Sequence, residues 1–176
     1  DTCIGRRCYE NPAYLDMLKM KIDLESSQTV FTQVSIYEVD KRAEYGFDDM
    51  QSKLESSFGT EIKVQKITYD MSQLGIWLID NNEGLHTPDD RILAYAMITN
   101  SVLITCDKGL ETAARNVDQD VINPDRTVID FSRTQSNLSK LAQSKVLLIR
   151  QKIQTINNAK SILLKPGQKI IWRSFV

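Results

Sequence analysis

The sequence predicts an α/β protein, a three-layer α/β/α sandwich with a mainly parallel sheet, followed by a basic C-terminal helix and hairpin extension. Short apolar or β-branched runs alternate with segments of helical spacing, as in parallel strands joined by helical crossovers. One run, residues 102–106, is apolar or β-branched throughout, which is typical of a parallel strand covered on both faces. The third observation is a change of charge after residue 131, which separates the sandwich from the extension.

The charge divides the chain into two parts. All 23 Asp and Glu residues lie in residues 1–131, where 13 Lys and Arg leave a net charge of −10. Residues 132–176 carry nine Lys and Arg and no acid. We therefore assign 1–131 to one domain and 132–176 to an extension suited to binding a polyanion. The alternative is that the extension only neutralises the acidic domain.

The first half of the chain opens on Asp1, with no strand before it, and continues through a polar segment. Apolar residues three or four positions apart indicate its helices, and β-branched or alternating runs indicate its strands. We predict helices at 11–25, 33–45, 46–58 and 70–80, and strands at 29–32 and 61–67.

The stretch from Thr87 to residue 99 predicts a helix with a defined start. Thr87 suits the N-cap and Pro88 the first helical position, while Asp90 stands three residues after the cap, as in a capping box. A turn of two residues then leads into the 102–106 strand, so the helix runs antiparallel to that strand. Its acidic N-terminus therefore lies at the same edge of the sheet as Asp107, which follows the strand.

The remaining elements are shorter, apart from one long helix. Apolar residues of helical spacing continue from residue 134 to 158, and Pro166-Gly167 suits the turn of a hairpin. We predict helices at 108–116 and 134–158, strands at 120–123 and 128–130, and a hairpin over 161–175.

Three acids reach one edge of the predicted sheet by connectivity alone. They are Glu38 after the first strand, Asp90 at the start of the antiparallel helix, and Asp107; Asp1 would join them if a strand precedes it. Two carboxylates about 4 Å apart repel by roughly 4 kcal/mol at an effective dielectric constant near 20. Such a cluster needs cations, and Mg²⁺ or Mn²⁺ with oxygen ligands fits that need. A metal-activated water is then the nucleophile, as in metal-dependent nucleases.

Four short motifs in order resemble those of the PIN-domain ribonucleases, which include the VapC-type toxins and several RNA-processing nucleases. The resemblance covers about residues 1–131. It implies that the first acid ends a central strand, which would lie upstream of this sequence. The matching motifs are Asp1-Thr2-Cys3, Ser35-x-x-Glu38, Asp90-x-x-Leu93-Ala94-x-Ala96 and Thr105-x-Asp107.

The resemblance implies a set of metal ligands. Thr105 would orient the last carboxylate. Asp89, next to Asp90, is the alternative ligand, and we prefer Asp90 because Ala94 follows it by four residues, as the pattern requires. The implied ligands of one or two Mg²⁺ or Mn²⁺ ions are Asp1, Glu38, Asp90 and Asp107.

The sequence thus predicts a divalent-metal-dependent endoribonuclease that hydrolyses RNA phosphodiester bonds. A non-catalytic RNA-binding or regulatory protein of the same fold is one alternative, and a toxin with an antitoxin partner is another. The apolar face of the 134–158 helix leaves a homodimer open, although covering its own domain is the more ordinary use. Within the extension, the residues suited to stacking on RNA or clamping it are Lys165, Lys169, Trp172 and Arg173.

Other chemistry and other locations have less support. The single histidine, His86, leaves no base for a nucleophilic triad, and three cysteines without a C-x-x-C pair argue against zinc and disulfides. Asp90 and Asp107 have capping roles as their alternatives, and Glu38 a solvated helix position. No apolar run approaches the roughly 18 residues of a membrane span. No signal-peptide pattern is present either, so we expect a cytoplasmic protein without membrane contact.

Overall fold

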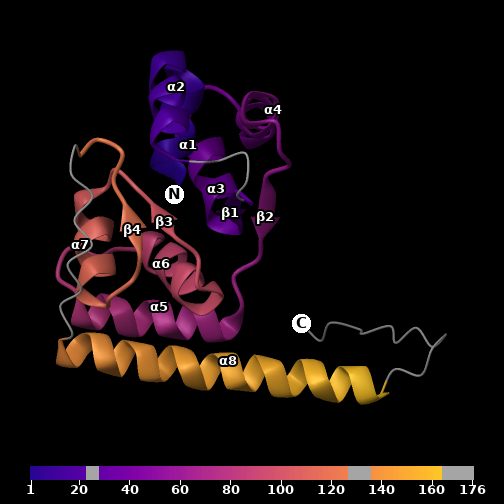
Figure 1. Ribbon diagram of the computed structural model, residues 1–176, viewed down its shortest axis with the longest axis vertical. Coiled ribbons are helices and arrows are strands. Elements are labelled where there is room, and N and C mark those ends of the chain that lie inside the picture. Colours follow the sequence, from indigo (N-terminus) through magenta and orange to yellow (C-terminus); the bar gives the residue numbers. More distant parts are fainter. Residues whose placement is uncertain (23–27, 127–135, 164–176) are drawn as a thin grey trace.

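The structure is a computed structural model that describes residues 1–22, 28–126 and 136–163, with side chains to residue 158. It is a mixed α/β structure, mostly helical, in which the described strands are short (Figure 1). The helices are α1 (Thr2–Glu10), α2 (Pro12–Lys21), α3 (Gln33–Arg42), α4 (Phe47–Phe58), α5 (Tyr69–Asn81), α6 (Asp89–Thr99), α7 (Lys108–Asn116) and α8 (Asn137–Leu163). The strands are β1 (Val30–Thr32), β2 (Lys63–Gln65), β3 (Leu103–Ile104) and β4 (Val121–Ile122).

The described strands form two parallel pairs. β1 pairs with β2, with Phe31 opposite Val64, and β3 pairs with β4, with Leu103 opposite Val121. A largely apolar hollow of about 360 Å³ lies between β1 and β3, and residues of both strands line it. The parallel pairing confirms the predicted α/β class and the parallel direction of the strands.

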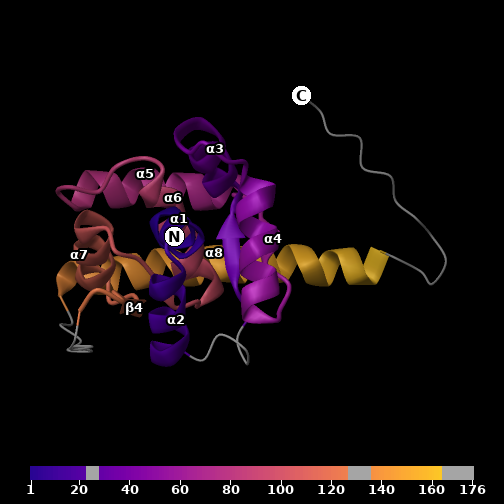
Figure 2. The same cartoon turned by 90° about the horizontal axis from the view of Figure 1, so that it is seen from above.

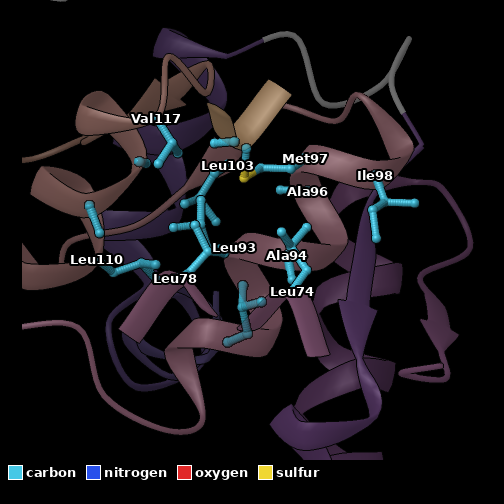
Figure 3. Close-up of a cluster of buried hydrophobic side chains, with 14 of the residues drawn as sticks. Leu74, Leu78, Leu93, Ala94, Ala96, Met97, Ile98, Leu103, Leu110 and Val117 are labelled. Carbon is cyan, nitrogen blue, oxygen red and sulfur yellow. The ribbon is translucent and has the colours of Figure 1, made fainter. Parts of the chain in front are cut away.

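Two hydrophobic cores follow the order of the chain. The first is built from α1 to α4 and β1, around Leu18, Phe47 and Met50. The second is built from α5 to α8 with β3 and β4, and Figure 3 shows Leu93 and Leu103 among its side chains. Helix α6 is buried on most of its surface, which explains why its sequence is apolar for two full turns.

Helix α8 covers the second core. Ala142 and Val146 are buried against it, and α8 contacts both α5 and α6. Arg150 donates to the carbonyl oxygens of Met97 (2.5 Å) and Ile98 (2.8 Å), which lie in the last turn of α6. Figures 1 and 2 show its C-terminal part extending past the other helices. No helix in the described ranges is both long enough and apolar enough to span a membrane.

Most predicted elements are confirmed, with four corrections. Residues 2–10, predicted as a polar segment, form α1, because Asp1 caps it and Ile4 and Cys8 face the core one turn apart. Helix α8 runs to Leu163, so the hairpin predicted from residue 161 does not begin there. The strand predicted at 102–106 is only Leu103–Ile104, and Val102 before it is 51% exposed, so the predicted run is not covered throughout. The strand predicted at 128–130 and the hairpin beyond residue 163 lie outside the described residues.

The fourth correction concerns the start of α6. Thr87 was predicted as the N-cap, but the N-cap is Pro88 and the first helical residue is Asp89. The backbone of Asp90 still bonds to His86 O (3.2 Å), so the turn before the helix is closed by main-chain contacts rather than by a capping side chain.

Candidate functional site

Four carboxylates from separate parts of the chain line one small hollow. Asp1 precedes α1, Glu38 lies in α3, Asp89 begins α6, and Asp107 follows β3. We call this space of about 140 Å³ the acidic hollow. Its other lining residues are Thr2, Cys3, Arg6 and Arg42.

Two threonines hold the first two carboxylates. The buried hydroxyl of Thr105 donates to Asp1 Oδ2 over 2.6 Å and accepts the backbone N–H of Asp107 at 2.9 Å. The sequence predicted that Thr105 would orient the carboxylate of Asp107, but its hydroxyl contacts the Asp107 backbone and the Asp1 side chain. Thr2 donates to Glu38 Oε2 over 2.6 Å. Both carboxylates are therefore fixed by a hydroxyl from a different element.

Ser35 and Arg42 flank Glu38 on α3. Ser35, in the S-x-x-E motif, is buried one turn before Glu38 and bonds to the Thr2 hydroxyl at 3.0 Å. Arg42 stands one turn after it, with Nη1 3.8 Å from Glu38 Oε1. The motif thus joins α3 to α1 through Thr2 and leaves one Glu38 oxygen facing an arginine.

The structure brings Asp89 to the acidic hollow and turns Asp90 away from it. Asp90 is 2% exposed and packs against Gly75 of α5, where an added Cβ would lie 2.5 Å from Asp90 Oδ2. Within the described residues, Asp90 Oδ1 has no hydrogen-bond partner. Burial raises the pKa of Asp90. The preference for Asp90 over Asp89 therefore does not match the geometry, because neighbouring positions on a helix face different sides.

Asp107 has two roles at once. Its Oδ1 accepts the backbone N–H of Leu110 at 2.8 Å, which makes it the N-cap of α7. The capping alternative is thus confirmed for Asp107, and the same side chain lines the acidic hollow. One cap hydrogen bond occupies a single carboxylate oxygen and leaves the other available.

The acids of the hollow repel one another. Burial raises the pKa of the Asp89 carboxyl to about 6, and the charge of Asp107 adds to this effect. The charges of Glu38 and Asp90 also raise the pKa of Asp89. An acid whose ionisation is opposed by its neighbours is stabilised by a cation placed among them.

Two cysteine thiols lie beside the hollow. The sulfurs of Cys3 and Cys106 are 2.8 Å apart, and Cys3 Sγ also donates to Asp1 Oδ2 at 2.8 Å. The hydrogen bond between the two sulfurs lowers the pKa of the Cys106 thiol to about 7 and raises the pKa of the Cys3 thiol. Both cysteines are free thiols, as is Cys8.

Sequence reasoning missed the two arginines at the hollow. Positive charge was expected from residues 132–176, but the described part of that segment contributes no lining residue, and Figure 1 shows α8 on the far side of α5 from the N-terminus. Helical spacing gave a usable signal, since Arg6 follows Thr2 by four residues and Arg42 follows Glu38 by four. Lys165, Lys169, Trp172 and Arg173 lie outside the described residues.

The donor set suits a hard cation in its chemistry. All four acids offer carboxylate oxygens, the ligands that Mg²⁺ and Mn²⁺ prefer. Among the residues that the structure describes, no three Asp, Glu, His or Cys side chains are arranged so that they could hold a metal ion as they stand.

Comparison with protein-family models, with curated proteins and with solved structures finds no match for this chain.

Proposed function

We propose that the protein is a divalent-metal-dependent endoribonuclease of PIN type. The observation that carries this proposal is the meeting of Asp1, Glu38, Asp89 and Asp107 in one hollow with two arginines at its lining. Four carboxylates in one hollow repel one another and favour a cation between them, and a phosphodiester needs arginines to approach four acids.

The four carboxylates of the acidic hollow are the proposed metal ligands. Asp1, Glu38, Asp89 and Asp107 are the ligands of one or two Mg²⁺ or Mn²⁺ ions, with Asp89 in place of Asp90. When bound by these residues, such an ion would supply activation of a water molecule and stabilisation of the leaving oxygen. Asp89 is half-buried and Asp107 is exposed, so both side chains would have room to turn toward such an ion.

Two further groups act on the ligands and the substrate. Thr105 and Thr2 hold the Asp1 and Glu38 carboxylates in place, as supporting hydrogen bonds do for metal ligands. Arg6 and Arg42 bind the phosphate of the RNA.

We also propose that the fold is the three-layer α/β/α sandwich predicted from the sequence. We propose that the two pairs, which form separate two-stranded sheets in the structure, belong to one sheet with helices on both faces, and residues of β1 and β3 line the 360 Å³ hollow between them. Support comes from the parallel direction of the strands within each pair and from the position of the acids, since Glu38 and Asp107 both follow the carboxyl ends of strands.

Cleavage of a labelled single-stranded RNA tests the proposal, with Mn²⁺, Mg²⁺ or EDTA present. The decisive pair of variants is Asp89→Asn and Asp90→Asn, which make the same change one residue apart. We expect metal-dependent cutting by the parent protein, a loss on the order of 100-fold in Asp89→Asn, and cutting within a few-fold of the parent in Asp90→Asn.

Two results would contradict the proposal. Folded protein that cuts no RNA with either metal indicates a non-catalytic RNA-binding protein instead. Equal cutting by Asp89→Asn and the parent removes the acidic hollow as the site. Circular dichroism of each variant separates a lost site from a lost fold.

A further inference from the structure

A second hollow continues from the acidic hollow along α3. It measures about 480 Å³ and lies between α3, the chain leading into α5, and the start of α6. Glu38 and Arg42 line both hollows. We call this second space the α3 groove. The two hollows are therefore adjacent, on either side of Glu38 and Arg42.

The charge changes sign between the two hollows. The acidic hollow has four carboxylates against Arg6 and Arg42. The α3 groove has Lys41, Arg42 and Arg91 against the single carboxylate of Glu38. Three cations around one acid attract phosphates, and the partial apolar lining of Val34 and Ile67 suits the face of a base rather than a free ion.

Tyr37 offers an aromatic surface in this groove. It is 65% exposed although it is a large aromatic residue, and it lines both the α3 groove and a further hollow of about 440 Å³ next to it. Lys41 Nζ lies 5.3 Å from the centre of the ring and donates to the Tyr37 hydroxyl over 3.1 Å. The lysine thus limits the movement of the ring while leaving much of its surface to solvent.

We propose that the α3 groove binds a nucleotide of single-stranded RNA next to the phosphodiester that is cut. Its base stacks on Tyr37, and the neighbouring phosphates contact Lys41, Arg42 and Arg91. The strand must be single, because a base inside a duplex cannot stack on a side chain. The position relative to the cut rests on the proposed ribonuclease function, whereas binding in the groove can be measured without cleavage.

The test is fluorescence anisotropy of a short labelled single-stranded RNA in EDTA. Tyr37→Ala should weaken binding about tenfold, the usual effect of losing one stacked base. Tyr37→Phe keeps the ring and should bind within about threefold of the parent. Lys41→Ala and Arg91→Ala should each make the slope of log K against log salt less steep by about 0.7. Arg42 stays unchanged because it also lines the acidic hollow.

An exposed tyrosine and an exposed lysine outside the α3 groove serve as matched controls. Tyr69, 75% exposed at the start of α5, lines neither the acidic hollow nor the α3 groove, and Lys19 is an exposed lysine on α2. Tyr69→Ala and Lys19→Ala should bind RNA as the parent does. Tyr37→Ala that binds as tightly as Tyr69→Ala would overturn the proposal.

An abasic nucleotide identifies the stacking contact itself. Moved through the RNA, it should weaken binding at one position for the parent and at no position for Tyr37→Ala. The same abasic penalty in both proteins would contradict stacking on Tyr37. The two proposals can fail separately. If only the ribonuclease proposal fails, RNA binding still depends on Tyr37 although neither the parent nor any variant cuts the RNA.

Discussion

At the residue scale, the contrast between Asp89 and Asp90 decides which carboxylate lines the acidic hollow. A step of one residue turns a helical side chain by about 100°, so one carboxylate faces the hollow and the other faces Gly75. The pKa of Asp89 is raised from 3.8 to about 6, which means that the folded protein binds this proton more tightly than the unfolded chain. The stability from that proton is complete below pH 3.8 and is lost as the pH rises to about 6.

Asp89→Asn should therefore stabilise the metal-free protein at neutral pH. Because this carboxyl is partly solvated, we expect a gain of about 1 kcal/mol at pH 7 and almost none at pH 4. Urea unfolding in EDTA at both pH values measures it. Asp16→Asn, an exposed acid on α2, is the control. A gain of equal size at both pH values would show that ionisation of Asp89 is not its cause.

Gly75 supplies the second prediction at this scale. Glycine in a helix interior normally costs about 1 kcal/mol relative to alanine, so Gly→Ala usually stabilises a helix. Here a Cβ would lie 2.5 Å from Asp90 Oδ2. Gly75→Ala should instead lower the free energy of unfolding by about 1–3 kcal/mol. Thermal unfolding measures this, with Ile76→Ala, an exposed position of the same helix, as control. A rise in melting temperature for Gly75→Ala would show that α5 and α6 move apart freely.

At the element scale, Glu111 attaches α7 to the end of β4. It is 1% exposed; Oε1 accepts from Arg115 at 3.0 Å, and Oε2 accepts from Asn123 (2.7 Å) and Arg126 (3.2 Å). The residues predicted from the sequence do not include Glu111, whose burial and pairing with Arg115 and Arg126 are seen only in the structure.

Glu111→Gln should destabilise the protein. The neutral amide cannot accept from both arginines as a carboxylate does, so we expect a loss of about 2 kcal/mol in the free energy of unfolding. Urea unfolding measures the loss, and Glu83→Gln, an exposed acid before α6, should change little. An unchanged midpoint for Glu111→Gln would mean that α7 is held by its apolar face alone.

The sequence predicted the elements better than their ends. Periodicity locates α3, α4, α5 and α7 because each buries one apolar face. It missed α1, where Gly5, Arg6 and Arg7 interrupt the apolar pattern between Ile4 and Cys8. Helix starts depend on competition among neighbouring caps, and the start of α6 at Asp89 instead of Pro88 shows the size of that error.

For the candidate site too, the sequence predicted the general position better than the exact residues. Connectivity predicted that acids after β1, before α6 and after β3 would share one edge, and the structure places Glu38, Asp89 and Asp107 in one hollow. Connectivity does not specify which of two adjacent acids faces inward, because that depends on the first residue of the helix. Gly75 was the available signal, since a glycine inside a helix often marks a close approach by a neighbour.

At the scale of the whole molecule, the basic segment has more than one use. Arg150 binds the last carbonyls of α6, and Lys152 pairs with Asp70 at 2.7 Å, so part of its charge holds α8 to the protein. We expect the remaining charge after residue 163 to act on RNA. Removing residues 164–176 deletes Lys165, Lys169 and Arg173, which should make the salt slope of single-stranded RNA binding less steep by about 2. An unchanged slope in salt titrations would confine RNA binding to the rest of the protein.

If the acidic hollow binds a cation as proposed, its position between the two hydrophobic cores would also affect stability. Asp1 and Glu38 belong to the half of the chain that builds the first core, while Asp89 and Asp107 belong to the half that builds the second. A cation held by all four acids is bound only when both halves are folded and correctly placed. At a free concentration 100 times its dissociation constant, it stabilises that state by about 2.7 kcal/mol. Cation concentration would then set the cooperativity of unfolding, and amide hydrogen exchange would slow in both cores together.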